Sequence, residues 1–151
     1  MKFSFSITAI LSLLFSFNLL SADISVSEQY VSETIPGTTI SSAYMTLANK
    51  SQKPITLTSV TSTVSRRIEM HEHIMSEEMM KMQQVDSIII NANDKVVLQP
   101  HGYHIMVFNL EEPLQADTEI SMTLHFDNKE NVIIEVPVQG FKQQNTKRNN
   151  H

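Results

Sequence analysis

The sequence predicts an all-β protein with a sandwich or barrel architecture. Apolar and polar residues alternate with period two along most of the chain after residue 39, as they do in strands that have one face against a core. Polar turn clusters separate these runs, and no helix-length window carries an apolar stripe at helical spacing. Short, regularly spaced strands without helices are typical of β-sandwiches and β-barrels.

The first element of the chain is an apolar segment, residues 3–20, which follows a positively charged start. Ser21 and Ala22 come next, just before the acidic Asp23. This layout is typical of a secretory signal peptide, so we expect residues 1–22 to be removed by cleavage after Ala22. The alternative is a membrane anchor, for which the segment is short and rich in serine. Because no cysteine follows the segment, we do not expect a bacterial lipid anchor.

The strands expected after this segment are short. The clearest one has Ile120, Met122 and Leu124 alternating with polar residues. The polar cluster at 91–94 predicts a turn, and Pro137 predicts an edge position for the last strand, since proline cannot donate a hydrogen bond. We expect eight or nine strands from the following candidate ranges, some of which can merge: 23–30, 40–48, 54–61, 66–72, 79–84, 87–91, 95–98, 103–109, 117–126 and 131–138.

We expect one folded domain at residues 23–138 and a flexible polar tail at 139–151. A chain of this length can bury a core without disulfides, and cysteine is absent. The formal net charge is -5, and the sequence contains no cluster of basic residues that would form a positively charged stripe. We therefore do not expect the protein to bind nucleic acid.

Two histidines and two methionines form the motif H-x10-M-x21-H-x-M, made by His71, Met82, His104 and Met106. Thioethers are soft donors that favour Cu(I), and imidazole is compatible with that ion. His104 and Met106 are two residues apart, so one strand would present both on one face. A hairpin turning at 75–79 would bring His71 and Met82 towards each other. The pattern predicts a Cu(I) site, although packing or solvation explains His104 alone equally well and explains His71, Met82 or Met106 alone better.

This motif resembles that of the periplasmic copper chaperones called the PCuAC family. The segment Pro100-His101-Gly102-Tyr103-His104-Ile105-Met106 is similar to the family's Pro-Gly-Gly-Tyr-His-x-Met, and the early strand 43–46 and the last strand, ending at Val138, also fit. The likeness covers residues 24–138. It implies a cupredoxin-like Greek-key β-sandwich with a copper site exposed near one end.

The resemblance also implies a function. It is that of a periplasmic Cu(I) carrier that passes its ion by ligand exchange towards the CuA centre of cytochrome c oxidase, either to the CuA subunit or alongside a thiol-bearing copper chaperone. We expect a monomer, although an exposed site would also allow two chains to share one ion. Two other functions stay open: a copper-buffering protein without a dedicated acceptor, and a metal-free secreted β-sandwich that binds a protein partner.

Two histidines depart from the family pattern. His101 stands where the family has glycine, and His73 lies two residues after His71. Either imidazole could act as an alternate ligand or recruit Cu(II), which prefers nitrogen and oxygen donors. Four further methionines could shield the ion, form a second transient site or simply pack; they are Met70, Met75, Met79 and Met80.

Several activities have no support in the sequence. A blue-copper electron carrier needs a cysteine thiolate, and the chain has none. Its three glycines are too few and too scattered for a nucleophile elbow or a phosphate-binding loop. The run from His71 to Met75 starts like a zinc-protease helix but lacks the second histidine four residues on. We therefore do not expect an enzyme.

Overall fold

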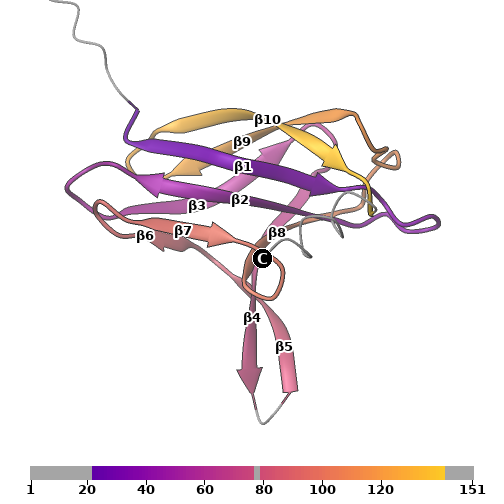
Figure 1. The fold of residues 1–151 in the computed structure, drawn as a ribbon, viewed down its shortest axis with the longest axis horizontal. Helices are drawn as coiled ribbons and strands as arrows, with labels where there is room; N and C mark the ends of the chain where they lie inside the picture. Colours follow the sequence, from indigo (N-terminus) through magenta and orange to yellow (C-terminus); the bar gives the residue numbers. More distant parts are fainter. Residues whose placement is uncertain (1–21, 77–78, 142–151) are drawn as a thin grey trace, which may run out of the picture.

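The computed structural model describes residues 22–76 and 79–141, and these form a two-layered β-sandwich (Figure 1). The all-β prediction is therefore confirmed. Its ten strands are β1 (Ile24–Ser32), β2 (Ser41–Asn49), β3 (Ile55–Ser62), β4 (Arg67–Ser76), β5 (Met79–Val85), β6 (Ile88–Ile90), β7 (Lys95–Leu98), β8 (Tyr103–Phe108), β9 (Glu119–Phe126) and β10 (Asn131–Gln139).

The strands follow one hydrogen-bonded path in the order β5-β4-β8-β2-β1-β10-β9-β3-β6, with β7 paired to β2 beside it. The parallel pairing of β1 with β10 joins the two layers, while every other pairing is antiparallel. β4 and β5 lie at one end of this path, and Figure 1 shows their hairpin projecting from the body of the sandwich.

The core lies between the layers and is built by alternating residues. Ile120, Met122, Leu124 and Phe126 of β9 are all buried, as the period-two pattern predicts. On the opposite layer the buried set includes Met45 of β2. Burying one such side chain stabilises the fold by about 1.5–3 kcal/mol. This core holds the sheet from which the hairpin projects.

The β4–β5 hairpin is longer than the sequence predicts. We expected its connection at residues 75–79, but the ladder continues to the pair Ser76↔Met79. Met75 and Met79 are therefore strand residues, because cross-strand pairing continues past the apolar run that defined the prediction. Only residues 77–78 remain between the two strands, and these lie outside the described residues.

The edge position expected from Pro137 is wrong. β10 lies between β1 and β9. Proline is tolerated there because the paired residues of the β1–β10 ladder are only Val31↔Val138 and Ser32↔Gln139, so this ladder begins just after Pro137.

The signal peptide and the polar tail that the sequence predicts lie mostly outside the described residues. Residues 1–21 of the expected signal peptide and residues 142–151 of the expected tail lie outside the described residues, while Gln139 still belongs to β10. Within the described ranges, no helix has the length and apolar character needed to cross a membrane.

Candidate metal site

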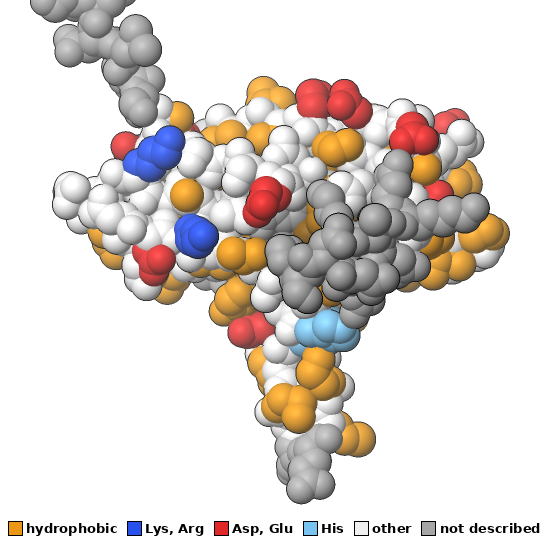
Figure 2. Space-filling view, viewed as in Figure 1, with side chains coloured by type: hydrophobic (Ala, Val, Ile, Leu, Met, Phe, Trp, Pro, Cys, Tyr) orange, Lys and Arg blue, Asp and Glu red, His pale blue; other side chains and the backbone are white. Residues whose placement is uncertain are grey.

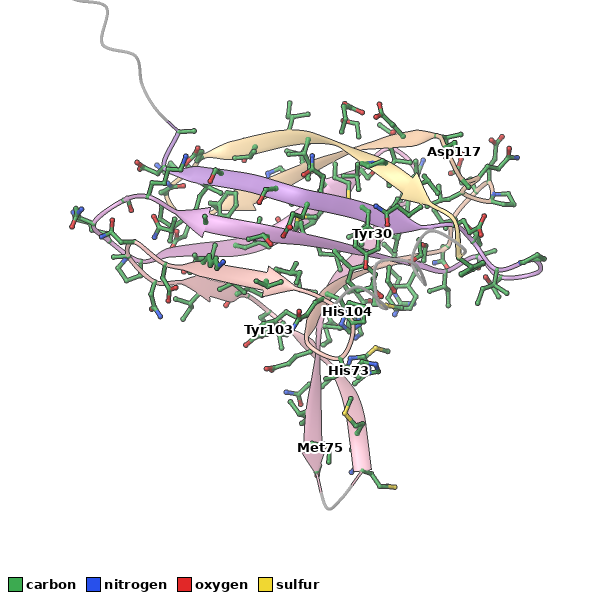
Figure 3. All side chains as sticks on the ribbon, viewed as in Figure 1. Tyr30, His73, Met75, Tyr103, His104 and Asp117 are labelled. Atoms are coloured by element: carbon green, nitrogen blue, oxygen red, sulfur yellow. The ribbon has the colours of Figure 1, made fainter. Side chains whose placement is uncertain are left out.

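The candidate site lies where the projecting hairpin meets the body of the sandwich, on one face of β4, β5 and β8 (Figure 3). Side chains two residues apart on a strand share a face, so His71 and His73 project together from β4. His104 and Met106 do so from β8, as the sequence predicts. In the space-filling view, the exposed histidine surface lies at the base of the hairpin (Figure 2).

His71 and His104 form the centre of this face. They are directly opposite each other in the β4–β8 ladder, and their ring centres are 5.9 Å apart. Two imidazoles that bind one ion at about 2 Å each have ring centres about 4.5–6 Å apart. Their residues are only 8% and 3% exposed, so the rings are held by surrounding packing. The pair is thus spaced for a shared ion.

The hydrogen bonds of both rings assign their protons. His104 Nδ1 lies 3.0 Å from the carbonyl oxygen of Gly102, which can only accept, so Nδ1 carries the proton and Nε2 carries a lone pair. His71 Nε2 donates to the Glu69 carboxylate at 2.8 Å, so in the neutral ring the lone pair is on Nδ1. His71 Nδ1 is buried and has no hydrogen-bond partner among the described residues. Each ring therefore has one free donor atom, and the second nitrogen is anchored as in many metal sites.

The two methionines of the motif differ in exposure. Met82 of β5 is 48% exposed, and its Sδ lies 3.2 Å from His104 Nε2. Because Nδ1 holds the ring proton, this contact brings two lone-pair atoms together, an arrangement that a bound cation would stabilise. Met106 is buried, and its Sδ accepts a hydrogen bond from the Ser42 hydroxyl at 3.1 Å. That bond orients the thioether and leaves its second lone pair available.

Burial and neighbouring groups shift the pKa of two side chains at the candidate site, His104 and Glu69. Burial lowers the pKa of His104, and the neighbouring charges of His73 and His71 lower it further, against the opposing effect of the Gly102 hydrogen bond. The hydrogen bond from His71, followed by that from Arg67, lowers the pKa of Glu69. The imidazole of His104 is therefore neutral at neutral pH, and the carboxylate of Glu69 is ionised.

All four motif residues lie on one face, and the hairpin brings Met82 to the neighbourhood of His71, as expected, but not directly opposite it. His73, not His71, is opposite Met82, while His71 is opposite Gln84. His71 and Met82 are therefore diagonal neighbours on one face of the hairpin rather than a directly opposite pair. Met82 still reaches His104, since both lie next to His71 and His73 on the same face.

His73 belongs to the cluster more closely than the four-residue motif indicates. Its ring stacks on that of His104 with centres 5.0 Å apart, and the centre of the His101 ring lies 5.8 Å from that of His73. His73 Nδ1 is buried and has no hydrogen-bond partner among the described residues. The sequence analysis named His73 as a possible alternate ligand, and the His-x-His spacing on a strand places its ring on the same face as that of His71.

Histidines and carboxylates alone do not make this site. In the part of the chain that the structure describes, no group of three or more His, Cys, Asp or Glu residues is placed to hold an ion. The thioethers of Met82 and Met106 are further donor groups on the same face. Two neutral imidazoles and two thioethers suit a soft monovalent ion such as Cu(I).

The four methionines of β4 and β5 outside the motif occupy two environments. Met70 is buried in the core, on the face of β4 opposite to His71. Met75, Met79 and Met80 are exposed on the hairpin. The packing interpretation is thus correct for Met70.

Comparison with known proteins identifies the family. The family model described as "Putative lipoprotein LpqE-like" matches residues 24–138, and the chain belongs to this family, which is the PCuAC family. It is 29% identical over 110 residues to "Putative lipoprotein Lxx21020" of Leifsonia xyli and 32% identical over 99 residues to "Uncharacterized protein RP573" of Rickettsia prowazekii. These matches cover 72% and 65% of this chain but 66% and 55% of the relatives, so the chain spans less than two thirds of their length.

Solved structures with the same fold are PCuAC domains. The copper-bound PCuAC domain from PmoF2 superposes with a TM-score of 0.68 at 21% identity, covering 79% of this chain and 94% of that one. The solution structure of CuI-DR1885 from Deinococcus radiodurans gives a TM-score of 0.61 at 25% identity, covering 82% and 81%. The predicted cupredoxin-like Greek-key β-sandwich is thereby confirmed.

Proposed function

We propose that this protein is a copper carrier that holds one Cu(I) with His71, Met82, His104 and Met106. The observation that carries the proposal is the orientation of free donor atoms: His71 Nδ1 is buried without a partner among the described residues, and His104 Nε2 points at Met82 Sδ from 3.2 Å. Membership of the PCuAC family supports it, as does the likeness to CuI-DR1885, whose name states that it binds Cu(I).

The proposed mechanism is ligand exchange without redox chemistry. All four donors are neutral, so they hold Cu(I) less tightly than a set of thiolates would. Met82 is half exposed, which allows an incoming ligand to reach the ion from the solvent side. A thiolate-rich acceptor would displace the thioethers first and then the imidazoles. The protein itself has no cysteine and so cannot trap the ion.

We further propose that the carrier works outside the cytoplasm, in the periplasm, after export through its N-terminal segment. The family description, with its reference to a lipoprotein, supports that location. The proposed acceptor is the CuA centre of cytochrome c oxidase or a thiol-bearing chaperone that serves it. Loss of CuA copper in a deletion strain would support delivery, whereas reduced copper tolerance with a normal oxidase would support a buffering role.

A competition titration tests the site. The chain without residues 1–22 is titrated against a coloured Cu(I) chelator under anaerobic conditions. We expect one tightly bound Cu(I) per chain, and loss of competition in a Met82→Leu, His104→Ala variant. The matched control is Met79→Leu, which changes the same residue type on the other face of the same strand. Failure of the native chain to compete would contradict the proposed function.

A further inference from the structure

Three methionines line the face of the hairpin that leads from its tip to the candidate site. Met75 is directly opposite Met80, and the next pair towards the body on the same face is His73↔Met82. These pairs share a face because they are two residues apart along each strand. Figure 3 shows Met75 near the tip of the hairpin and His73 nearer the body, below His104.

The three side chains are unusually open to solvent for large apolar residues. Met75 is 69% exposed, Met80 50% and Met82 48%. Directly opposite strand residues have Cβ atoms about 5 Å apart, so flexible thioethers at positions 75 and 80 can meet at one point. The exposure places their sulfur atoms within reach of a solvated ion.

We propose that Met75, Met80 and Met82 form a second, outer Cu(I) site through which the ion enters and leaves the inner site. This inference rests on the proposed function, since it assigns a route to the same ion. Met82 belongs to both sites: its sulfur stays bound to copper while the ion moves from the tip towards the histidines.

The transfer step is a ligand substitution at Cu(I). The copper–sulfur bonds to Met75 and Met80 break as copper–nitrogen bonds form to His71 Nδ1 and His104 Nε2, and Met106 completes the inner set. Copper remains monovalent throughout. No proton moves, because the second nitrogen of each ring already carries the proton, held by Glu69 or by Gly102.

The two sites differ in strength for a physical reason. The outer site is solvent-exposed and has only thioether donors, so it binds weakly and exchanges fast. The inner site adds two imidazoles held by packing and hydrogen bonds, so little ordering is needed when the ion arrives. An ion taken up at the tip therefore moves inward, and an acceptor that docks at the tip removes it through the same ligands.

The test compares two leucine variants, which keep the apolar surface but remove sulfur. Met75→Leu, Met80→Leu removes two outer donors. Met79→Leu is the control: Met79 is 61% exposed and pairs with Ser76, which puts it on the other face of the hairpin. Stopped-flow transfer of Cu(I) between the protein and a coloured chelator is measured in both directions, together with the equilibrium affinity.

We expect the double variant to transfer Cu(I) severalfold more slowly in both directions while its affinity for the first ion is unchanged, and we expect the control to match the native chain. A weak second equivalent of Cu(I), held by Met75 and Met80 while Met82 binds the first ion, is detected through the methionine methyl NMR signals and should disappear only in the double variant. Native rates in the double variant would overturn the outer site and favour a purely apolar docking surface. Absence of any Cu(I) binding by the native chain would instead refute the proposed function itself.

Discussion

His71 and His104 face each other across the β4–β8 ladder, and each uses one ring nitrogen for a hydrogen bond that leaves the other free. The two anchors differ: a carboxylate for His71 and a backbone carbonyl for His104. The carbonyl cannot be removed by mutation, whereas the carboxylate can. The role of the anchors in copper binding is therefore tested at Glu69.

Glu69→Gln should weaken Cu(I) binding by about tenfold, because outer partners of ligating histidines typically contribute that much to metal affinity. The amide keeps the shape of the carboxylate but loses the charge that holds the Nε2 proton of His71. Chelator competition measures the change. Glu72→Gln, on the other face of β4, is the control, and equal affinities for the two variants would refute the anchoring role.

Met82→Leu should lower Cu(I) affinity with almost no effect on stability. Substitutions at half-exposed positions usually change the free energy of unfolding by less than about 0.5 kcal/mol, and Met82 is 48% exposed. Chelator competition should therefore show reduced Cu(I) affinity, whereas urea unfolding should show an almost unchanged free energy of unfolding. A large loss of stability would show that Met82 is a packing residue.

Met70→Ala should lower the stability of the fold and leave the Cu(I) affinity unchanged. Met70 is 5% exposed within the core, and truncating a buried methionine costs about 2–5 kcal/mol of unfolding free energy. Urea unfolding measures this loss. Under conditions in which the variant is folded, its Cu(I) affinity should remain that of the native chain, since Met70 lies on the face away from the histidines.

The metal-free protein should lose stability as the pH falls below 6.5, the ordinary value for histidine. The pKa of His104 is lowered in the fold, mainly by burial, so the unfolded chain binds the proton more readily. The stabilising contribution is present above pH 6.5 and is lost as the pH falls through the folded pKa. Affinity for Cu(I) should fall in the same range, because protonation removes the donor lone pair.

Urea unfolding at about pH 7.5 and about pH 5.5 measures this dependence. The window lies above 4.5, the ordinary pKa of glutamate, so Glu69 with its lowered pKa does not contribute. His104→Gln should reduce the difference between the two pH values. An unchanged difference in that variant would assign the effect to another group.

Much of the fold could be predicted because alternation is a local signal. The run from Ile120 to Phe126 has one face in the core, so its period of two is visible in the sequence and appears as β9. The edge assignment of Pro137 failed because strand order depends on long-range pairing, which leaves no local pattern. The paired part of the β4–β5 hairpin was predicted too short because its exposed methionines do not alternate with polar residues.

The sequence could indicate which residues make up the candidate site, but not the strand register or the hydrogen bonds that arrange them. The spacing of His104 and Met106 implies a shared face whatever the rest of the fold. The register of β4 against β5, by contrast, is set by a turn whose position the sequence leaves open, and it decides that His73 is opposite Met82. The hydrogen bond that places the proton of His71 on Nε2 is accepted by Glu69. Glu69 belongs to no sequence motif that would have predicted this contact.

The most direct test of the central claim is copper X-ray absorption of the Cu(I)-loaded chain without residues 1–22. Its scattering distinguishes sulfur from nitrogen ligands. The proposed site predicts two sulfur and two imidazole nitrogen neighbours, with one sulfur lost in Met82→Leu and none lost in Met79→Leu. A spectrum with nitrogen or oxygen neighbours alone, or one unchanged by Met82→Leu, would contradict the assignment of the site.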